Sequence, residues 1–247
     1  MSLIEFKNVV KRFDGEEVLS GLSFSVEKGE VFVIVGPSGT GKSVTLKTIV
    51  RLLSPNSGSV CVDGVEVNSC SEKELALVRS KIGYLFQGAA LLQWMTVEEN
   101  VALPLKEITD LPDCEIEEKV SLALEAVELT EARKKYPSEI SGGMQKRAGL
   151  ARAIVRNVDI VLYDEPTSGL DPVTTLAVNR FILKLNREMG LTSIVVTHDL
   201  SSALNYASRI MLLKDGKVVE CAPPKEFLAS KKPEVLEFLS AMKGDLQ

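Results

Sequence analysis

The chain has 247 residues, of which 45% are hydrophobic and 26% charged, with a formal net charge of −5. This length and composition allow one large α/β domain with a sizeable core, and the acidic balance argues against a protein that binds nucleic acid over a broad basic face. Four scattered cysteines (Cys61, Cys70, Cys114 and Cys221), without a CxxC pair or metal-ligand spacing, favour reduced thiols in a cytosolic protein.

Short apolar runs separated by turns make up the first third of the chain. Strands are expected at residues 3–10, 22–26, 31–35 and 59–67, with turns at Asp14-Gly15, Lys28-Gly29 and Asp63-Gly64. The first run contains Glu5 and alternates in polarity, which is typical of a strand rather than of a signal peptide. The run VFVIV at residues 31–35 is apolar throughout, as in a strand covered on both faces, but is far too short to span a bilayer.

Strands and helices alternate further along the chain. Three more apolar runs, at residues 82–86, 159–163 and 192–197, are expected to be strands. Apolar residues recur at helical spacing in residues 115–129 and 144–155, and residues 233–243 form a short amphipathic helix pattern that starts at a proline. The pattern predicts an α/β core with a helical insert.

A glycine-rich loop joins the strand at residues 31–35 to a helix. It reads Gly36, Pro37, Ser38, Gly39, Thr40, Gly41, Lys42 and Ser43, followed by Val44. Glycines in such a loop let successive backbone N–H groups turn towards phosphate oxygens, and the helix N-terminus adds a partial positive charge. The pattern predicts that these residues bind ATP, that Lys42 reaches the β- and γ-phosphates, and that the Ser43 hydroxyl ligates Mg²⁺. The alternative, a chance glycine-rich turn, is disfavoured by the match at all eight motif positions.

Two acids follow the apolar run at residues 159–163. A phosphate loop needs an acid that organises the metal and a base that orients water. Asp164 is therefore predicted to hold the Mg²⁺ shell, and Glu165, the next residue, to polarise the attacking water. The alternative is a pair of ordinary solvated acids at a strand end.

His198 and Gln87 also follow expected strands. His198, the single histidine of the chain, comes directly after residues 192–197, at the strand end where α/β proteins bind ligands. It is predicted to contact the γ-phosphate, with a histidine satisfied elsewhere as the alternative. Gln87 follows the run at residues 82–86 and is predicted to reach the metal or the attacking water.

The stretch ISGGMQKRAGLARA, residues 140–153, reads as a helix opened by Ser141, Gly142 and Gly143. Such an N-terminus suits an anion, yet no lysine-bearing loop is there. With the other motifs in their order, it resembles the signature of ATP-binding cassette (ABC) transporter ATPases. The resemblance covers nearly the whole chain, and it adds to the motifs above Phe13 before the first turn and Ser168-Gly-Leu-Asp171 after the acids.

The resemblance implies a head-to-tail, ATP-dependent homodimer. In ABC proteins the Ser-Gly-Gly helix start of one cassette closes over the γ-phosphate held by the other. Ser141, Gly142 and Gly143 are therefore expected to complete a partner's site, Asp171 to connect the two sites, and Phe13 to stack on adenine. From the residues alone, Phe13 is equally a packed aromatic, and Asp171, which precedes a proline, is equally a helix cap.

The signature departs from its commonest form, which has Leu first and Gln fifth. Ile140 is a mild exchange, whereas Met144 removes an amide near the partner's nucleotide. Gln145 does not replace that amide, because one helical step rotates it by ~100°. Since the Ser and Gly contacts are kept, ATP-driven closure is expected to survive.

Residues 83–105 (GYLFQGAALLQWMTVEENVALPL) and the helix after Ser141 are similar to ATPases of the MlaF or Mkl type, which power Mce/Mla phospholipid transport between bacterial inner and outer membranes. The resemblance implies a peripheral subunit on the cytoplasmic side of the inner membrane, bound to an MlaE-type permease. An Mce-domain protein and an MlaB-like STAS protein are further implied partners. The residues expected to line the groove for a permease coupling helix are Ala89, Ala90, Leu91, Leu92 and Trp94, with burial in the helical insert as the alternative for Trp94.

Other functions differ in how well the sequence supports them. An ABC importer ATPase for another solute, such as an amino acid, is the nearest alternative. A soluble ABC protein acting on DNA or ribosomes is disfavoured by the one cassette and the acidic balance. A regulatory module without catalysis is disfavoured because Lys42, Asp164, Glu165 and His198 are all present.

The expected architecture is one ABC ATPase domain of the α/β class. It comprises a phosphate-loop NTPase core with a mostly parallel sheet, an N-terminal antiparallel β subdomain and an inserted α-helical subdomain. Residues 1–87 and 159–220 are expected to form the nucleotide-binding core with the β subdomain, residues 88–158 the helical subdomain, and residues 221–247 a C-terminal helical segment.

Overall fold

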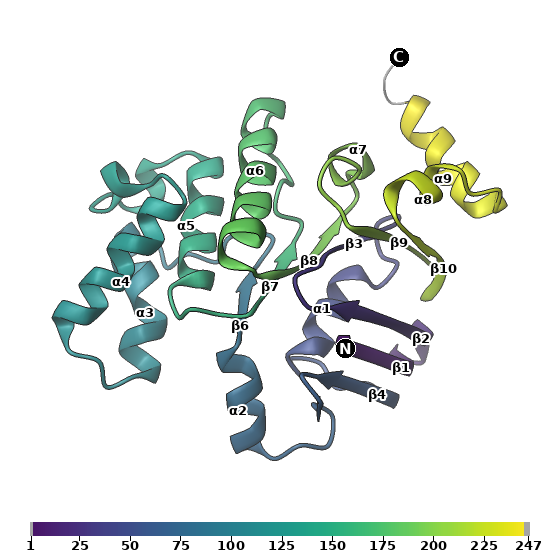
Figure 1. Ribbon diagram of the computed structural model, residues 1–247, viewed down its shortest axis with the longest axis horizontal. Coiled ribbons are helices and arrows are strands. Elements are labelled where there is room, and N and C mark those ends of the chain that lie inside the picture. The colour runs from purple at the N-terminus through teal and green to yellow at the C-terminus, as the bar shows by residue number, and fades with distance from the viewer. Residues whose placement is uncertain (1, 245–247) are drawn as a thin grey trace. The chain divides into compact units, whose positions relative to one another are not determined.

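The computed structural model describes residues 2–244 (Figure 1). Contacts between residues divide the chain into two compact units. The first unit is Met1–Val78 with Ile194–Gln247, and the second is Arg79–Ser193. Residue 1 and residues 245–247, which the expected terminal segments include, lie outside the described residues. Within residues 2–244, no helix combines the length and apolarity that a membrane span requires.

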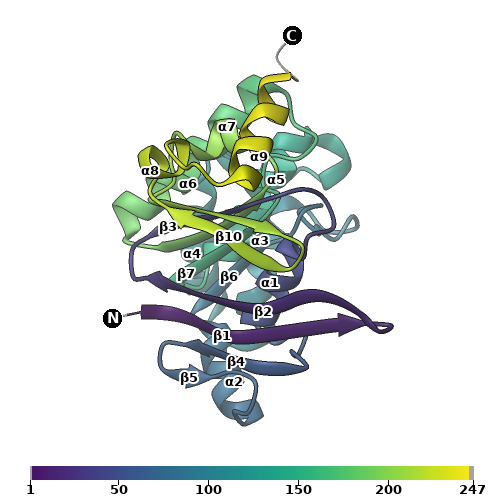
Figure 2. The same cartoon turned by 90° about the vertical axis from the view of Figure 1, so that its right-hand side faces the viewer.

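An antiparallel sheet in the order β2-β1-β4-β5 opens the first unit (Figure 2). Its strands are β1 (Ser2–Phe13), β2 (Glu16–Glu27), β4 (Ser57–Val62) and β5 (Val65–Glu66). Asp14 (φ 49°) and Gly15 (φ 89°) make the two-residue turn between β1 and β2, as the Asp-Gly pair predicts. Asp63 and Gly64 turn β4 into β5 in the same way.

Four more strands of the first unit follow the order β10-β9-β3-β8. They are β3 (Val31–Val35), β8 (Thr192–Thr197, whose first two residues belong to the second unit), β9 (Arg209–Lys214) and β10 (Lys217–Ala222). β3 pairs in parallel with β9, and β9 pairs antiparallel with β10. The helices are α1 (Lys42–Ile49), α7 (Leu200–Ala203), α8 (Pro224–Leu228) and α9 (Pro233–Gly244).

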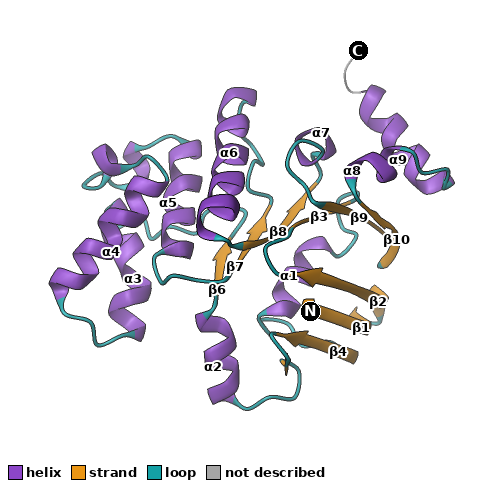
Figure 3. Ribbon diagram, in the orientation of Figure 1, coloured by secondary structure: helices purple, strands orange, loops and turns teal. Residues whose placement is uncertain are grey.

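The second unit is mainly helical. Helix α2 (Glu72–Ser80) leads into it from the first unit, and the parallel pair β6 (Ile82–Leu85) and β7 (Ile160–Asp164) flanks most of its helices in sequence. The remaining elements are α3 (Val97–Ile108), α4 (Asp113–Ala126), the 3₁₀ turns η1 (Thr130–Ala132) and η2 (Pro137–Glu139), α5 (Gly142–Ile154) and α6 (Pro172–Met189). Figure 3 shows α3, α4 and α5 side by side, as their contacts require.

The helix expected at residues 115–129 is observed as α4, which begins two residues earlier and ends at Ala126. The end comes early because Glu128 has a left-handed backbone (φ 56°) and the N–H of Leu129 returns to the carbonyl of Leu124. The helix expected at residues 144–155 begins at Gly142, since Ser141 caps it. Helices α3 and α6, which the apolar pattern did not predict, start at the side-chain caps Thr96 and Asp171.

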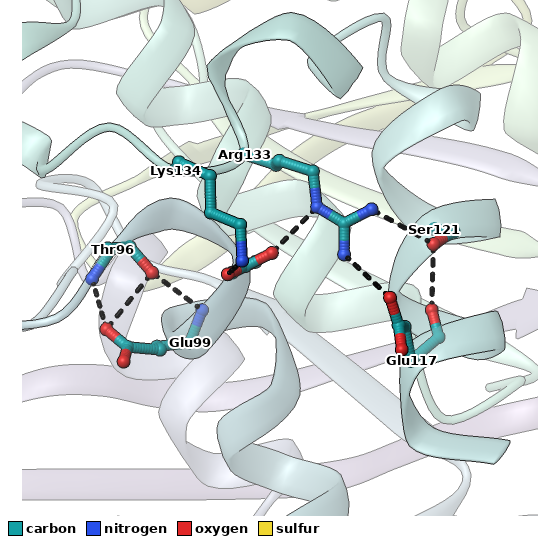
Figure 4. Close-up of polar contacts among 7 residues, drawn as sticks. Thr96, Glu99, Glu117, Ser121, Arg133 and Lys134 are labelled. Atoms are coloured by element: carbon teal, nitrogen blue, oxygen red, sulfur yellow. Dashed lines mark hydrogen bonds and ion pairs between the residues drawn. The ribbon is translucent and has the colours of Figure 1, made fainter. Parts of the chain in front are cut away.

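A polar network joins α3, α4 and the loop before the signature (Figure 4). The Arg133 Nε donates to Glu98 at 2.7 Å, Lys134 also donates to Glu98, and another Arg133 nitrogen lies 3.7 Å from Glu117. The N–H of Glu98 in turn donates to the Arg133 carbonyl at 2.9 Å. The start of α3 is thereby fastened to the loop that leads towards Ser141.

Each unit has its own buried apolar core. The first includes Ile4, Phe6, Leu22, Val33, Ile34, Leu46, Ile49 and Leu212. The second includes Val97, Val101, Leu105, Ile116, Leu124, Leu150, Val161 and Leu162. The subdomain boundaries expected at residues 87/88 and 158/159 both fall within the second unit, and they remain a prediction.

Candidate active site

The glycine-rich loop connects the fully buried strand β3 to the N-terminus of α1. Two of its glycines are required by close approaches. A Cβ on Gly36 would lie 2.1 Å from the Leu213 carbonyl oxygen, and a Cβ on Gly41 (φ 96°) would lie 2.7 Å from the Leu19 side chain. The backbone of the loop can therefore keep this course only with glycine at both positions.

Lys42 folds back over the loop that precedes it. It is only 7% exposed, and its ammonium donates to the carbonyls of Gly36 (2.7 Å) and Pro37 (2.8 Å). Ser43 and Val44 follow on the first turn of α1 and are half-buried, while Pro37, Ser38 and Gly39 are exposed and Thr40 is half-buried. An ammonium, a serine hydroxyl and the positive end of a helix, together around a loop too tight for side chains, fit a nucleotide phosphate chain and its Mg²⁺.

His198 comes from the strand next to the phosphate loop. The loop follows β3, His198 follows β8, and β3 and β8 are neighbours. The imidazole is exposed, and the next residue, Asp199, caps α7 through the N–H of Ser202 at 3.0 Å. The strand order is thus compatible with the predicted γ-phosphate contact.

Phe13 lies at the tip of the β1–β2 hairpin. It ends β1, pairs with Glu16 and is 39% exposed. The ammonium of Lys11 lies 4.9 Å from the centre of its ring. The partly exposed ring is not the packed aromatic of the alternative interpretation, and stacking on adenine stays a prediction.

Gln87 and Glu165 have equivalent positions on a parallel pair of strands. Leu85 of β6 is in register with Tyr163 of β7, and Gln87 and Glu165 each come two residues later. Gln87 is exposed, whereas Glu165 is 8% exposed and has a left-handed backbone with φ 49°. The structure therefore brings together these two predicted catalytic residues at one end of the strand pair.

Asp164, the last residue of β7, is almost completely buried at 4% exposure. The Tyr84 hydroxyl donates to its Oδ2 at 3.3 Å, and burial together with the neighbouring Asp164 charge raises the pKa of Tyr84. A buried carboxylate that accepts a hydrogen bond from a neutral phenol is not an ordinary solvated acid. Asp164 thus has the oxygen donor type that Mg²⁺ prefers.

Lys146 of α5 connects this region to the signature helix. It is 6% exposed, and its ammonium donates to the carbonyl of Gln87 and, at 3.2 Å, to that of Glu165. Burial lowers the pKa of Lys146, while the charges of Glu165 and Asp164 oppose that effect. The motifs in the sequence predicted no role for this lysine.

The signature begins α5 as expected from its serine. Ser141 is exposed and is the N-cap, accepting from the N–H of Met144 at 3.3 Å. Gly142 is exposed, but Gly143 is buried, and a Cβ there would lie 2.2 Å from the Thr174 side chain. The amide of Gln145 donates to the Pro137 carbonyl at 2.9 Å, so this residue turns back onto η2 rather than replacing the amide absent at Met144.

Asp171 is a helix cap in this structure, which is the alternative that the sequence left open. Its carboxylate accepts from the N–H groups of Val173 and Thr174 at 3.0 Å each. Hydrogen bonds from Thr174 and Val173 hold the pKa of Asp171 below its usual value. The predicted connection between two sites of a dimer is a separate role and stays a prediction.

The segment after Gln87 has both buried and exposed side chains. Ala89 and Leu91 are buried, Leu92 is half-buried, and Trp94 is 73% exposed. Ala90 is exposed and, with Tyr84, Phe86, Leu103, Ile108 and Arg152, belongs to the lining of a cavity of about 420 Å³. For Trp94 the structure therefore rules out burial within the chain, and contact with a permease stays a prediction.

Sequence reasoning missed three side chains near these residues: Tyr84, Lys146 and Arg152. Arg152 donates to the carbonyls of Ala89 and Ala90 at 2.7 Å each. Lys146 and Arg152 are six residues apart on one face of α5, and both bind carbonyls of the Gln87 segment. Their signal in the sequence was two basic residues on the face of a helix that also carries the small residue Gly149.

Comparisons with known proteins agree on one family. A model described as ABC transporter matches residues 19–168, more than half of the chain. Mkl of Mycobacterium leprae, named a probable ribonucleotide transport ATP-binding protein, is 41% identical over 96% of this chain and 68% of its own length. MetN 1 of Bacillus cereus, a methionine import ATP-binding protein, is 40% identical over 92% and 67%. MlaF of Haemophilus influenzae, the ATP-binding protein of an intermembrane phospholipid transport system, is 39% identical over 96% and 90%.

A solved structure gives the same assignment for the fold. The ATP-binding cassette MJ0796, in a dimeric post-hydrolysis state bound to ADP and Pi, superposes with a TM-score of 0.82 at 35% identity, over 90% of this chain and 98% of that one. The expected phosphate-loop NTPase fold is thereby confirmed. The chain spans about two thirds of the length of the Mkl and MetN relatives. It belongs to the ABC transporter family, as an ATPase subunit that uses ATP with Mg²⁺.

Proposed function

We propose that this ATPase powers phospholipid transport between the inner and outer membranes of a bacterium. The observation that carries the proposal is the similarity to MlaF of Haemophilus influenzae, at 39% identity over 238 residues and 90% of that protein. The segment Gly83–Leu105 and the signature with Met144 support it, because they resemble this type of ATPase beyond the motifs of the whole family.

In the proposed site, the loop Gly36–Val44 holds the phosphates, and Lys42 neutralises the β and γ groups. Ser43, Asp164 and Gln87 hold Mg²⁺, which neutralises charge on the phosphate oxygens when it is bound. Glu165 polarises the attacking water, and His198 contacts the γ-phosphate. The burial of Asp164 and Glu165, at 4% and 8% exposure, supports these roles, because carboxylates are seldom buried without a specific partner.

The working form in this proposal is a head-to-tail homodimer that closes on ATP. Ser141, Gly142 and Gly143 of one chain complete the site of the other, Asp171 connects the two sites, and Phe13 stacks on adenine. The dimeric state of the cassette MJ0796 supports a dimer, and the exposure of Ser141 and Gly142 leaves these residues accessible to a second chain.

ABC ATPases work with a membrane permease, and here we propose one of the MlaE type, on the cytoplasmic side of the inner membrane. Two features of the second unit support a docking surface after Gln87. Trp94 is 73% exposed, and a cavity of about 420 Å³ lies beside Ala90. Large aromatic side chains such as tryptophan are enriched at interface centres. An Mce-domain protein and an MlaB-like STAS protein are proposed as further members of the complex, with no nucleic acid.

The direct test is isolation of the native complex from its membrane, followed by lipid analysis. The proposal expects co-purification of a multi-spanning permease and an Mce-domain protein, with bound phospholipid above the level in a mock purification. A Trp94→Ala chain should recover less permease, while Leu122→Ala, which changes an exposed apolar residue on α4, should recover as much as the parent. A complex without Mce protein and lipid would contradict the lipid assignment.

Amino-acid import is the second candidate function. It is supported by MetN 1 of Bacillus cereus, whose identity of 40% is close to that of MlaF. The same purified complex separates the two candidates. Methionine that stimulates ATP hydrolysis, in a complex that contains a soluble solute-binding protein, would favour import over lipid transport.

A further inference from the structure

Lys146 has a buried ammonium group that is bound to two backbone carbonyls. Its ammonium is buried in the second unit, where it donates to the carbonyls of Gln87 and Glu165. A buried ammonium is costly unless its hydrogen bonds are satisfied. Here both acceptors belong to residues with proposed roles in hydrolysis, one from the end of β6 and one from the end of β7.

The backbone that Lys146 holds at Glu165 is strained. Glu165 has a φ of 49°, a left-handed conformation that residues with a Cβ adopt only at an energetic cost. Its carbonyl accepts from Lys146 and from the N–H of Ser168 at 3.2 Å each. These bonds favour the strained conformation, and that conformation sets the direction of the Glu165 carboxylate.

The same face of α5 also holds the segment after Gln87. Gly149 packs so closely that a Cβ there would lie 2.9 Å from the Leu85 side chain and 3.2 Å from Ala89. Arg152, one turn further, binds the carbonyls of Ala89 and Ala90, both of which have left-handed backbones with φ 58° and 48°. Ser141 caps this helix, so the signature serine and Lys146 belong to one continuous helix.

We propose that Lys146 is a positioning residue for ATP hydrolysis, whose ammonium fixes the carbonyls of Gln87 and Glu165 and so makes the placement of the Glu165 carboxylate depend on the helix that carries Ser141. The proposal rests on the proposed role of Glu165 in polarising water. It links the signature, which serves a partner's nucleotide, to the acid that serves the chain's own nucleotide.

The test compares Lys146→Met with Arg147→Met in the full chain. Arg147 is a matched control on the same helix, because it also donates to backbone carbonyls, those of Val127 and Glu128, but touches neither Gln87 nor Glu165. Misplacement of a catalytic group should lower kcat about 10- to 100-fold in Lys146→Met with KM for ATP changed less than about threefold. Arg147→Met should keep kcat within about threefold of the parent. An unchanged kcat in Lys146→Met, or an equal loss in both variants, would overturn the proposal.

Two further substitutions keep the test decisive if Lys146→Met does not fold. Lys146→Gln removes the ammonium with a smaller change of polarity and should lose kcat as Lys146→Met does. Lys146→Arg keeps a cationic donor and should recover most of the lost kcat. Loss of kcat in the arginine variant equal to that in the glutamine variant, with ATP binding retained in both, would show that the donated hydrogen bonds are not what matters.

A double-mutant cycle identifies the residue through which Lys146 acts. In a Glu165→Gln background, Lys146→Met should lower the residual rate by less than about threefold, because the group that it positions is already lost. The same 10- to 100-fold loss in both backgrounds would overturn positioning of Glu165. Failure of the proposed role of Glu165 itself is seen separately, as a parent-like rate in the Glu165→Gln single variant.

Discussion

The two units hold their predicted site residues in different ways. In the first, the phosphate loop is continuous in sequence and largely braces itself, with Lys42 bonded to the carbonyls of Gly36 and Pro37. In the second, the groups come from β6, α5 and β7, and Lys146 reaches across 59 residues to Gln87 and 19 to Glu165. The first arrangement depends on local backbone geometry, whereas the second depends on how helices pack against a strand pair. Substitutions in the two units should therefore impair different properties of the protein.

The largest effect is expected in the second unit. Glu165→Gln should lower ATP hydrolysis by about 10²–10⁴, the range for loss of a general base, while ATP binding is kept. Steady-state hydrolysis and equilibrium nucleotide binding measured on the same preparation separate the two properties. A variant that hydrolyses ATP at the parent rate would show that Glu165 is not the base.

A substitution in the phosphate loop of the first unit should weaken ATP binding instead of slowing hydrolysis alone. Lys42→Ala removes a charged donor from the phosphate loop, and charge-assisted hydrogen bonds of this kind predict a loss of ATP affinity of about 10- to 100-fold. Lys47→Ala, on the same helix but in its last turn, is the control and should bind as the parent does. Tight ATP binding by Lys42→Ala would contradict the expectation that the first unit governs ATP binding and the second governs hydrolysis.

Gly143→Ala tests the packing on which the second unit depends. The new Cβ would lie 2.2 Å from the Thr174 Cγ2, and Thr174 cannot simply rotate because its hydroxyl and N–H both bond Asp171. Overpacking of this kind should lower the free energy of unfolding by about 1–3 kcal/mol, measured by urea denaturation. Gly142→Ala is the control, since its Cβ would meet only Leu170, at 3.7 Å. Equal stability of the two variants would contradict this account of Gly143.

The smallest effect concerns the polar network of Figure 4. Burial pushes the pKa of Glu98 upwards, but hydrogen bonds from Lys134 and Arg133 outweigh burial and hold it below the usual value. Glu98→Gln should therefore cost about 1–2 kcal/mol of unfolding free energy at pH 7, whereas Glu117→Gln, 72% exposed and 3.7 Å from Arg133, should cost under about 0.5 kcal/mol.

The pH dependence of that difference has a definite sign. A carboxyl whose pKa is lowered by folding stabilises the protein fully above its unfolded pKa, about 4.3 for Glu, and loses this contribution as the pH falls through the folded pKa. The gap in stability between the parent and Glu98→Gln should thus be present at neutral pH and close in acid. A gap that widens on acidification would contradict the role of the carboxylate.

The same contrast explains what could be predicted from sequence. The phosphate loop and the turns at Asp14-Gly15 and Asp63-Gly64 are local, and the structure has them where their residues indicate. Strands β3 and β8 also match their apolar runs residue for residue. Contacts between residues far apart in the sequence have no comparable local pattern that would predict them. Neither the donation of Tyr84 to Asp164 nor that of Lys146 to Glu165 can be derived from spacing along the chain.

Gly143 and Asp171 show a further limit of prediction from motifs. The family resemblance assigned both to a partner's nucleotide or to the dimer interface. The structure gives each of them a task within its own chain, because Gly143 packs on Thr174 and Asp171 caps α6. A motif residue can satisfy both demands, so the pattern alone does not reveal which one fixes its identity.

We infer that each ATP site of the proposed dimer takes its phosphate loop from one chain and its signature from another. Mixing two inactive variants, Ser141→Arg and Lys42→Ala, tests it most directly. A heterodimer of these variants has one site with an intact loop and an intact signature, so hydrolysis should recover on mixing to at most about half of the parent rate, with each variant alone inactive. No recovery, with heterodimers shown to form by dual-tag purification, would contradict the claim.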